Sequence, residues 1–114
     1  MASNGYNPSI VLAYWRSYGI PEPELEWKFL EDRKFRFDFA WVGHKVYLEC
    51  DGGIWIAGRH TRGAALKKEW EKRNLATIHG WRGLWCEPRD ICTPEVVDAI
   101  RFSLNAAIIT RRKK

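Results

Sequence analysis

Residues 35–53 read FRFDFAWVGHKVYLECDGG, and their alternation of large apolar and polar side chains constrains the fold more than any other feature of the chain. A period of two is the pattern of a β-strand with one buried face. The run divides into strands over 35–41 and 45–51, and Gly43 and His44 between them predict a two-residue hairpin turn. In the first strand one face is expected to carry Phe35, Phe37, Phe39 and Trp41.

This hairpin brings three acids to one face. If Val42 pairs with Lys45 across the turn, the numbers of paired residues sum to 87, so Asp38 lies opposite Glu49. Their Cβ atoms would then be about 5 Å apart. Asp51 follows two residues later and therefore points to the same face.

The preceding segment 25–30 (LEWKFL) also alternates and predicts a third strand. A three-residue turn at 31–33 makes paired numbers sum to 64 and places Glu26 beside Asp38. A two-residue turn would send Glu26 to the opposite face.

Neighbouring carboxylates repel one another unless a positive group compensates them. Hard divalent cations do so through oxygen ligands, and Mg²⁺ typically takes one or two protein carboxylates. We therefore expect a Mg²⁺ site at Asp38, Glu49 and Asp51. The alternative is a solvated face on which Arg36 and Lys28 neutralise the acids.

The rest of the chain predicts three helices and one further strand. Asn7 and Pro8 are typical of a helix start, and Gly19 of its end. A helix over 64–79 and a strand over 82–87 follow the hairpin. One side of that helix is traced by Leu66, Trp70, Arg73 and Thr77, and Gly80 ends it. The last helix begins at Pro94, and its apolar stripe comprises Val96, Val97, Ile100, Leu104, Ala107 and Ile108.

The predicted order is helix, three strands, helix, strand, helix. Three consecutive strands favour an antiparallel meander, and the following strand–helix–strand step favours a right-handed parallel crossover. We therefore expect a single α/β domain over residues 1–114, with a mixed sheet of about four strands flanked by helices. The basic end, residues 110–114, is expected to be flexible.

Composition narrows the class of partner. Lys and Arg number 19 against 14 acids, a net charge of +5, which favours a polyanion such as nucleic acid. The chain has no apolar run long enough to span a membrane and no secretory pattern at its start. Cys50, Cys86 and Cys92 are odd in number and lack CxxC spacing, so we expect a cytoplasmic protein.

The phrase GIPEPELEWKF…RKFRFDFAW…VYLECDGGIW…GRHTRG…EKRN…GW resembles the PD-(D/E)XK nuclease superfamily over about residues 18–91. Within it, the phrase is similar to small phage and bacterial endonucleases akin to the very-short-patch repair nucleases and related homing endonucleases. The resemblance implies a restriction-endonuclease-like core. It also implies that Asp38, Glu49 and the backbone carbonyl of Cys50 bind the metal, with Glu26 as a further acid.

The chain departs from this family at position 51, where the superfamily usually has lysine and this sequence has Asp51. By the resemblance, Asp51 would hold a second metal ion or order a water molecule. The base that activates water would then be His60 or a lysine of the following helix, for which Lys72 is the best match.

Several residues could contact the DNA backbone or bases. Arg59 and Arg62 lie in the Gly-rich segment after the acidic strand, and Lys67 and Lys68 follow on the next helix. These cations could equally form a solvated surface. Trp55 is a candidate for stacking on a base or wedging a junction.

The sequence therefore predicts a Mg²⁺-dependent DNA endonuclease, with Mn²⁺ able to substitute, acting in a bacterial or phage-infected cell. A phage-type enzyme that resolves branched DNA such as Holliday junctions is one subtype, and Phe102 and Ile109 could then seed a homodimer. The competing hypotheses are a site-specific nicking or homing-type endonuclease, a nucleic-acid-binding module without catalysis, and a metal-stabilised interaction protein.

Overall fold

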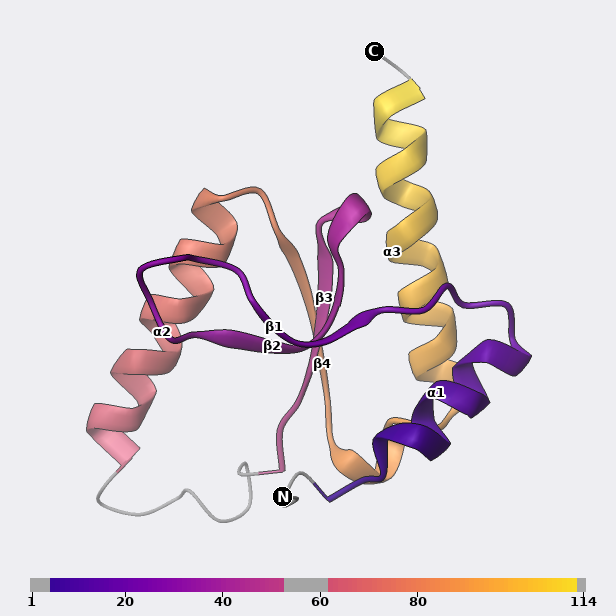
Figure 1. Ribbon diagram of the computed structural model, residues 1–114, viewed down its shortest axis with the longest axis horizontal. Helices are drawn as coiled ribbons and strands as arrows, with labels where there is room; N and C mark the ends of the chain where they lie inside the picture. The colour runs from indigo at the N-terminus through magenta and orange to yellow at the C-terminus, as the bar shows by residue number, and fades with distance from the viewer. Residues whose placement is uncertain (1–4, 53–61, 113–114) are drawn as a thin grey trace.

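The computed structural model describes residues 5–52 and 62–112, and in the second range the side chains of residues 63–106. A four-stranded sheet forms the middle layer, with α2 on one side and α1 and α3 on the other (Figure 1). The chain is thus a mixed α/β domain with the predicted order of helices and strands. The elements are α1 (Pro8–Ser17), β1 (Glu24–Lys28), β2 (Arg36–Trp41), η1 (Val42–His44), β3 (Val46–Cys50), α2 (Arg62–Ile78), β4 (Arg82–Cys86), η3 (Pro88–Asp90) and α3 (Pro94–Arg112).

The first helix begins and ends as predicted. The Asn7 side chain accepts hydrogen bonds from the N–H groups of Ser9 and Ile10 at 2.9 and 3.4 Å, and Pro8 is the first helical residue. Gly19 has φ of 80° and ends the helix in the left-handed conformation that glycine adopts without steric cost.

Both predicted hairpin registers are confirmed. Strands β1 and β2 are antiparallel with paired numbers that sum to 64, as in Leu25↔Phe39, and β2 and β3 with a sum of 87, as in Phe39↔Leu48. The predicted two-residue turn is wrong in detail. The chain instead forms the 3-10 turn η1 and reverses at Lys45, whose φ is 59°. Strand β4 is parallel to β3, as the crossover predicted.

Two apolar cores lie on opposite faces of the sheet. The larger one packs α1 and α3 against β2 and β3, and its buried members include Trp15, Phe39 and Leu48. The smaller one packs α2 against the other face around Tyr47 and Ala76. Edge strand β1 is mostly exposed, with Trp27 its only half-buried residue, so it is less buried than its alternation predicted.

The prediction that the aromatic residues of 35–41 share one face is wrong at Phe37. Phe39 and Trp41 belong to the larger core, whereas Phe37 belongs to the smaller core and stacks on Tyr47 with ring centroids 3.8 Å apart. Between Phe39 and Phe37, β2 changes the side of the sheet to which its aromatic residues point. At this place the neighbouring strand β1 contains Glu26, whose φ is 50°, and the backbone pairing of β2 with β3 ends at Phe39↔Leu48. Because a strand that leaves its neighbour is free to twist, its side chains no longer alternate between the same two layers.

The side of α2 that the sequence pattern traced does not pack on the sheet. Leu66 and Trp70 are 40 % and 51 % exposed, Arg73 and Thr77 are exposed, and Ala76 is the residue that is fully buried. Lys72 and Ala76, four residues apart, face the sheet, where Lys72 pairs with the buried carboxylate of Glu49. An ion pair with the sheet thus overrides the apolar pattern of the helix.

The last helix begins at Pro94 as predicted and continues to Arg112. Of its predicted apolar stripe, Val96, Val97, Ile100 and Leu104 are buried. The helix projects past the sheet (Figure 1). Phe102 is 75 % exposed, and the side chains of Ala107, Ile108 and Ile109 lie outside the described part. No helix in the described residues has the length and apolar character to cross a membrane.

Candidate functional site

Asp38 and Glu49 lie where β2 and β3 separate. Beyond Phe39↔Leu48 the backbone pairs stop, and the two carboxylates act as acceptors instead. Glu49 Oε2 accepts from the Asp38 N–H at 3.1 Å, and Asp38 Oδ2 accepts from the Cys50 N–H at 2.8 Å. Each acid is thereby held by the backbone of the opposite strand, so the pair is rigid as well as adjacent.

Lys72 completes this group from α2. Its Nζ donates to Glu49 Oε1 at 2.6 Å, and the side chains of Lys72 and Glu49 are 14 % and 10 % exposed. The ammonium group also lies 5.8 Å from the centre of the Phe37 ring. Lys72 was a predicted catalytic candidate, and it pairs with Glu49, while Glu69 on the same helix pairs with Arg73 at 3.4 Å.

The acids hold their protons more tightly than free carboxyl groups do. Burial raises the pKa of Glu49 from 4.5 to about 7, with Lys72 acting in the opposite direction. Burial also raises the pKa of Asp38, opposed by the Cys50 N–H and Lys72 and assisted by the negative charge of Asp51. Such shifted carboxyl groups are typical of sites that bind cations or do chemistry.

Glu26 and Asp51, the other two predicted acids, have exposed side chains, unlike Glu49. The register places Glu26 between pairs that flank Asp38, as predicted, but its side chain is exposed. Asp51 is also exposed, and its N–H donates to the Cys86 carbonyl at 2.9 Å. Among residues 5–52 and 62–112 as described, no group of three or more His, Cys, Asp or Glu side chains is arranged to hold a metal ion.

The donor set nevertheless fits a hard divalent cation. Asp38 and Glu49 supply adjacent carboxylate oxygens, and one or two protein carboxylates are what Mg²⁺ usually takes, with water and phosphate as further ligands. Lys72 already places a positive charge against Glu49. The same carboxylates therefore attract cations in the protein as it stands.

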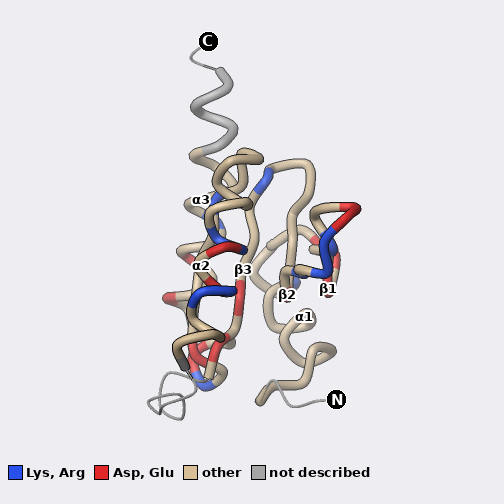
Figure 2. The backbone as a smooth tube through the Cα atoms, turned by 90° about the vertical axis from the view of Figure 1, so that its left-hand side faces the viewer, with Lys and Arg blue, Asp and Glu red and all other residues tan. Residues whose placement is uncertain are grey.

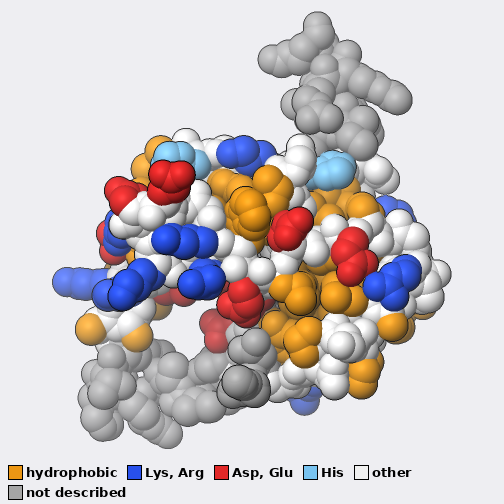
Figure 3. Space-filling view, viewed as in Figure 1, with side chains coloured by type: hydrophobic (Ala, Val, Ile, Leu, Met, Phe, Trp, Pro, Cys, Tyr) orange, Lys and Arg blue, Asp and Glu red, His pale blue; other side chains and the backbone are white. Residues whose placement is uncertain are grey.

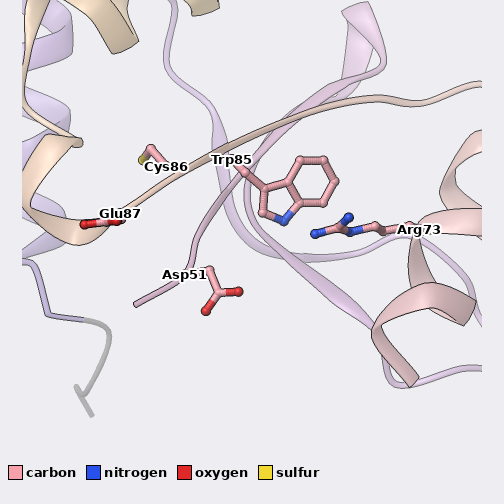
Figure 4. Close-up of a pocket in the computed structure, with 5 residues that line it drawn as sticks. All are labelled: Asp51, Arg73, Trp85, Cys86 and Glu87. Atoms are coloured by element: carbon pink, nitrogen blue, oxygen red, sulfur yellow. The ribbon is translucent and has the colours of Figure 1, made fainter. Parts of the chain in front are cut away.

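A pocket of about 250 Å³ adjoins the acidic pair, lined by Asp51, Arg73, Trp85, Cys86 and Glu87. Figure 4 shows Arg73 reaching from α2 to the Trp85 ring, with Asp51 at the end of β3 and Glu87 just after β4. The Arg73 guanidinium lies 4.3 Å from the centre of that ring. The pocket lies next to Glu49 because Trp85, which lines the pocket, is the register partner of Glu49 in the pairing of β3 with β4.

The predicted nucleic-acid contacts are only partly described. Lys67 and Lys68 are exposed on α2, whereas Trp55, Arg59 and His60 lie outside the described residues, as does the side chain of Arg62. Lys and Arg side chains gather over α2 in the space-filling view (Figure 3). Basic positions of α2 also lie beside the acidic end of β3 (Figure 2).

Arg73, Trp85 and Glu87 are not among the site residues predicted from the sequence. The place of Trp85 beside Glu49 depends on the register of β4 on β3, and no turn between these parallel strands fixes that register. Gly83 lies two positions before Trp85 and therefore on the same side of β4. Arg73 was placed on one side of its helix together with Leu66, Trp70 and Thr77. Arg73 could have been predicted from its position directly after Lys72, on the neighbouring face of the helix.

Comparisons of the chain with protein-family models, with curated proteins and with solved structures find no match.

Proposed function

We propose that this protein is a Mg²⁺-dependent DNA endonuclease of the PD-(D/E)XK type. The observation that carries the proposal is the Asp38–Glu49 pair, held at the point where two strands separate, with Lys72 bonded to Glu49. Two adjacent carboxylates and an ammonium group are a set that can bind a divalent cation and a phosphate together. Mn²⁺ is expected to substitute for Mg²⁺.

Asp38 and Glu49 would hold the metal, with the Cys50 carbonyl at the same end of β3 as a further oxygen ligand. When bound, Mg²⁺ would neutralise charge on the phosphate and make water a better nucleophile. The backbone N–H groups of Asp38 and Cys50 keep the two carboxylates in place for this task.

Lys72 takes the part of the lysine that the superfamily usually has at position 51. Hydrolysis forms one P–O bond to the oxygen of water and breaks one P–O ester bond, and the departing oxygen gains a proton. Lys72 Nζ, which donates to Glu49 at 2.6 Å, would orient the attacking water and stabilise negative charge on the phosphate. Asp51 is then not required as the base, and it lines the adjacent pocket.

Exposed Lys67 and Lys68 precede Lys72 on α2 and would contact DNA phosphates on either side of the cut. Within this class we favour a branched-DNA resolvase that acts as a homodimer, with exposed Phe102 on α3 as the first residue to test for pairing. A site-specific nicking or homing-type endonuclease is the nearest competitor.

A cleavage assay tests the proposal. Wild type, Asp38→Asn and Lys72→Met are incubated with end-labelled four-way junction, flap, single-stranded and duplex DNA, in Mg²⁺, Mn²⁺ or EDTA. Asparagine retains an oxygen acceptor for the Cys50 N–H, so Asp38→Asn should fold normally. Both variants should lose about 10²-fold or more in cleavage rate.

Asp98→Asn is a matched control, because Asp98 is an exposed acid on α3 whose partner is Arg101. It should cleave as wild type does. Paired symmetric cuts in the junction alone would identify a resolvase, and cleavage that ignores Asp38 or persists in EDTA would contradict the proposal.

One observation favours a second function, a DNA-binding module without catalysis. Lys72 already neutralises Glu49, and the described residues hold no larger metal-binding group. Binding to DNA without cutting under every metal would select this alternative.

A further inference from the structure

We propose that the Arg73–Trp85 pocket binds an unpaired nucleobase of the DNA, next to the phosphate that is cut. The inference rests on the proposed endonuclease function and adds the form of DNA that the site accepts. The pocket of about 250 Å³ lies beside the Asp38–Glu49–Lys72 group, since Trp85 is the register partner of Glu49. This volume is below that of a drug-sized ligand site and suits a single ring system.

Trp85 is a rigid aromatic surface. The residue is 36 % exposed, and its ring packs edge-to-face with Tyr47, with ring centroids 5.3 Å apart and planes at 79°. Tyr47 is itself fixed by stacking on Phe37. A partly exposed Trp that its neighbours hold in place is suited to stack on a base, an interaction worth about 1–3 kcal/mol.

The group that now covers Trp85 is readily displaced. Arg73 lies 4.3 Å from the ring centre and is held by Glu69 at 3.4 Å, but the two side chains are 47 % and 33 % exposed. Exposed helical ion pairs of this kind contribute little to stability. A base can therefore take the place over Trp85, while Arg73 turns to the phosphate of the same nucleotide.

The pocket offers hydrogen-bond acceptors to a base. Asp51 and Glu87 line it together with Arg73, and Glu87 also pairs with exposed Arg89 at 3.2 Å. Carboxylates accept hydrogen bonds from the N–H groups of bases, as from the amino group of cytosine. In this proposal the base meets the two carboxylates, and the phosphate meets Arg73 and Lys72, which both extend from α2.

A base inside duplex DNA is stacked and paired, so it can enter only where it is already unpaired or is flipped out at a cost of a few kcal/mol. The pocket thus selects flap, gapped or junction DNA over plain duplex.

The experiment measures binding by fluorescence anisotropy in EDTA, with a labelled single-stranded oligonucleotide, the gapped duplex and the intact duplex. Trp85→Ala and Arg73→Gln are compared with wild type and with Trp70→Ala. Trp70 is also exposed, at 51 %, and it lies on α2 outside the pocket, so it is a matched control. Trp85→Phe tests whether an aromatic ring restores binding, and circular dichroism checks the fold of each variant.

We expect Trp85→Ala to weaken binding of single-stranded and gapped DNA by about 5- to 100-fold, the range that one lost stacking contact implies. Duplex binding should change less than about twofold, Trp85→Phe should recover most of the affinity, and Trp70→Ala should match wild type. For the wild-type protein, an abasic site at the gap should weaken binding to a similar degree. This last measurement does not depend on the folding of any variant.

Equal losses for duplex and gapped DNA, or no effect of the abasic site, would overturn the inference. The cleavage assay distinguishes this failure from failure of the proposed function. If the wild type cuts DNA and Trp85→Ala retains the same preference between gapped and intact duplex, the nuclease proposal stands and the pocket proposal falls. If binding depends on Trp85 but nothing is cut, the nuclease proposal falls and the base site stands.

Discussion

Among the described residues, Glu49 is the one charged residue that is buried. It is 7 % exposed, and its two oxygens accept from Lys72 and from the Asp38 N–H. Even so, burial outweighs these partners and raises its pKa to about 7. A buried carboxyl group with a raised pKa destabilises the fold whenever it is ionised, and such a group persists where function requires it.

The pH dependence of stability should reveal this conflict. Between pH 4.5 and about 7 the folded protein keeps the Glu49 proton and the unfolded chain releases it. The folded state then binds more protons, so the free energy of unfolding falls as pH rises through that window. Urea titrations in EDTA should show wild type losing up to about 3 kcal/mol relative to Glu49→Gln from pH 5 to pH 8.

Gln at position 49 can still accept from the Asp38 N–H, and Lys72 and Asp38 face this position in both proteins. The comparison therefore isolates the charge of Glu49. Parallel stability curves over the whole range would mean that Glu49 titrates as an exposed acid does.

At the scale of the elements, close packing between β3 and β4 shapes the floor of the site. A Cβ added to Gly83 would lie 2.3 Å from Tyr47 Cζ and 2.7 Å from Trp85 Cζ3. The absence of a side chain at Gly83 thus lets the Tyr47 ring lie across β4 and stack on Phe37 at 3.8 Å. The same contact holds Trp85 in position.

Gly83→Ala should therefore lower the free energy of unfolding by about 1–3 kcal/mol, because the buried Tyr47 ring has to leave its stacked position. Gly43→Ala is the control, since nothing lies within 4 Å of a Cβ at that turn. Chemical denaturation of the two variants measures the difference. Equal stability would show that Tyr47 yields its place without loss.

At the scale of the whole molecule, β2 joins the two cores. Phe37 belongs to the core under α2, and Phe39, two residues later, to the core under α1 and α3. Loss of either core would expose the strand that supports the other one. We therefore expect the two cores to unfold together, as single domains of this size usually do.

Urea unfolding followed by far-ultraviolet circular dichroism and by tryptophan fluorescence should give one superimposable transition. Val97→Ala removes volume from a fully buried position in the larger core and should shift both curves to lower urea by the same amount. Separate transitions for the two probes would show that the α2 layer unfolds independently.

Local patterns in the sequence sufficed for the elements and for both hairpin registers. Asn7, Pro8 and Gly19 bound the first helix through hydrogen bonds within a few residues, which a reader of the sequence can count. Alternation and the position of the turn likewise placed Asp38 beside Glu49, although the turn is a 3-10 turn rather than a two-residue one. These features were predictable because residues close in the chain decide them.

The tertiary structure alone decided which faces these residues present and what meets them. The turn of Phe37 into the second core follows from the separation of β2 and β3, which no local pattern encodes. The inward rotation of α2, which brings Lys72 to Glu49, depends on a charge buried in a distant strand. Trp85 comes beside Glu49 through a parallel register that no turn sets. Each of these outcomes depends on contacts between segments far apart in the chain, where burial and charge compensation outweigh local preference.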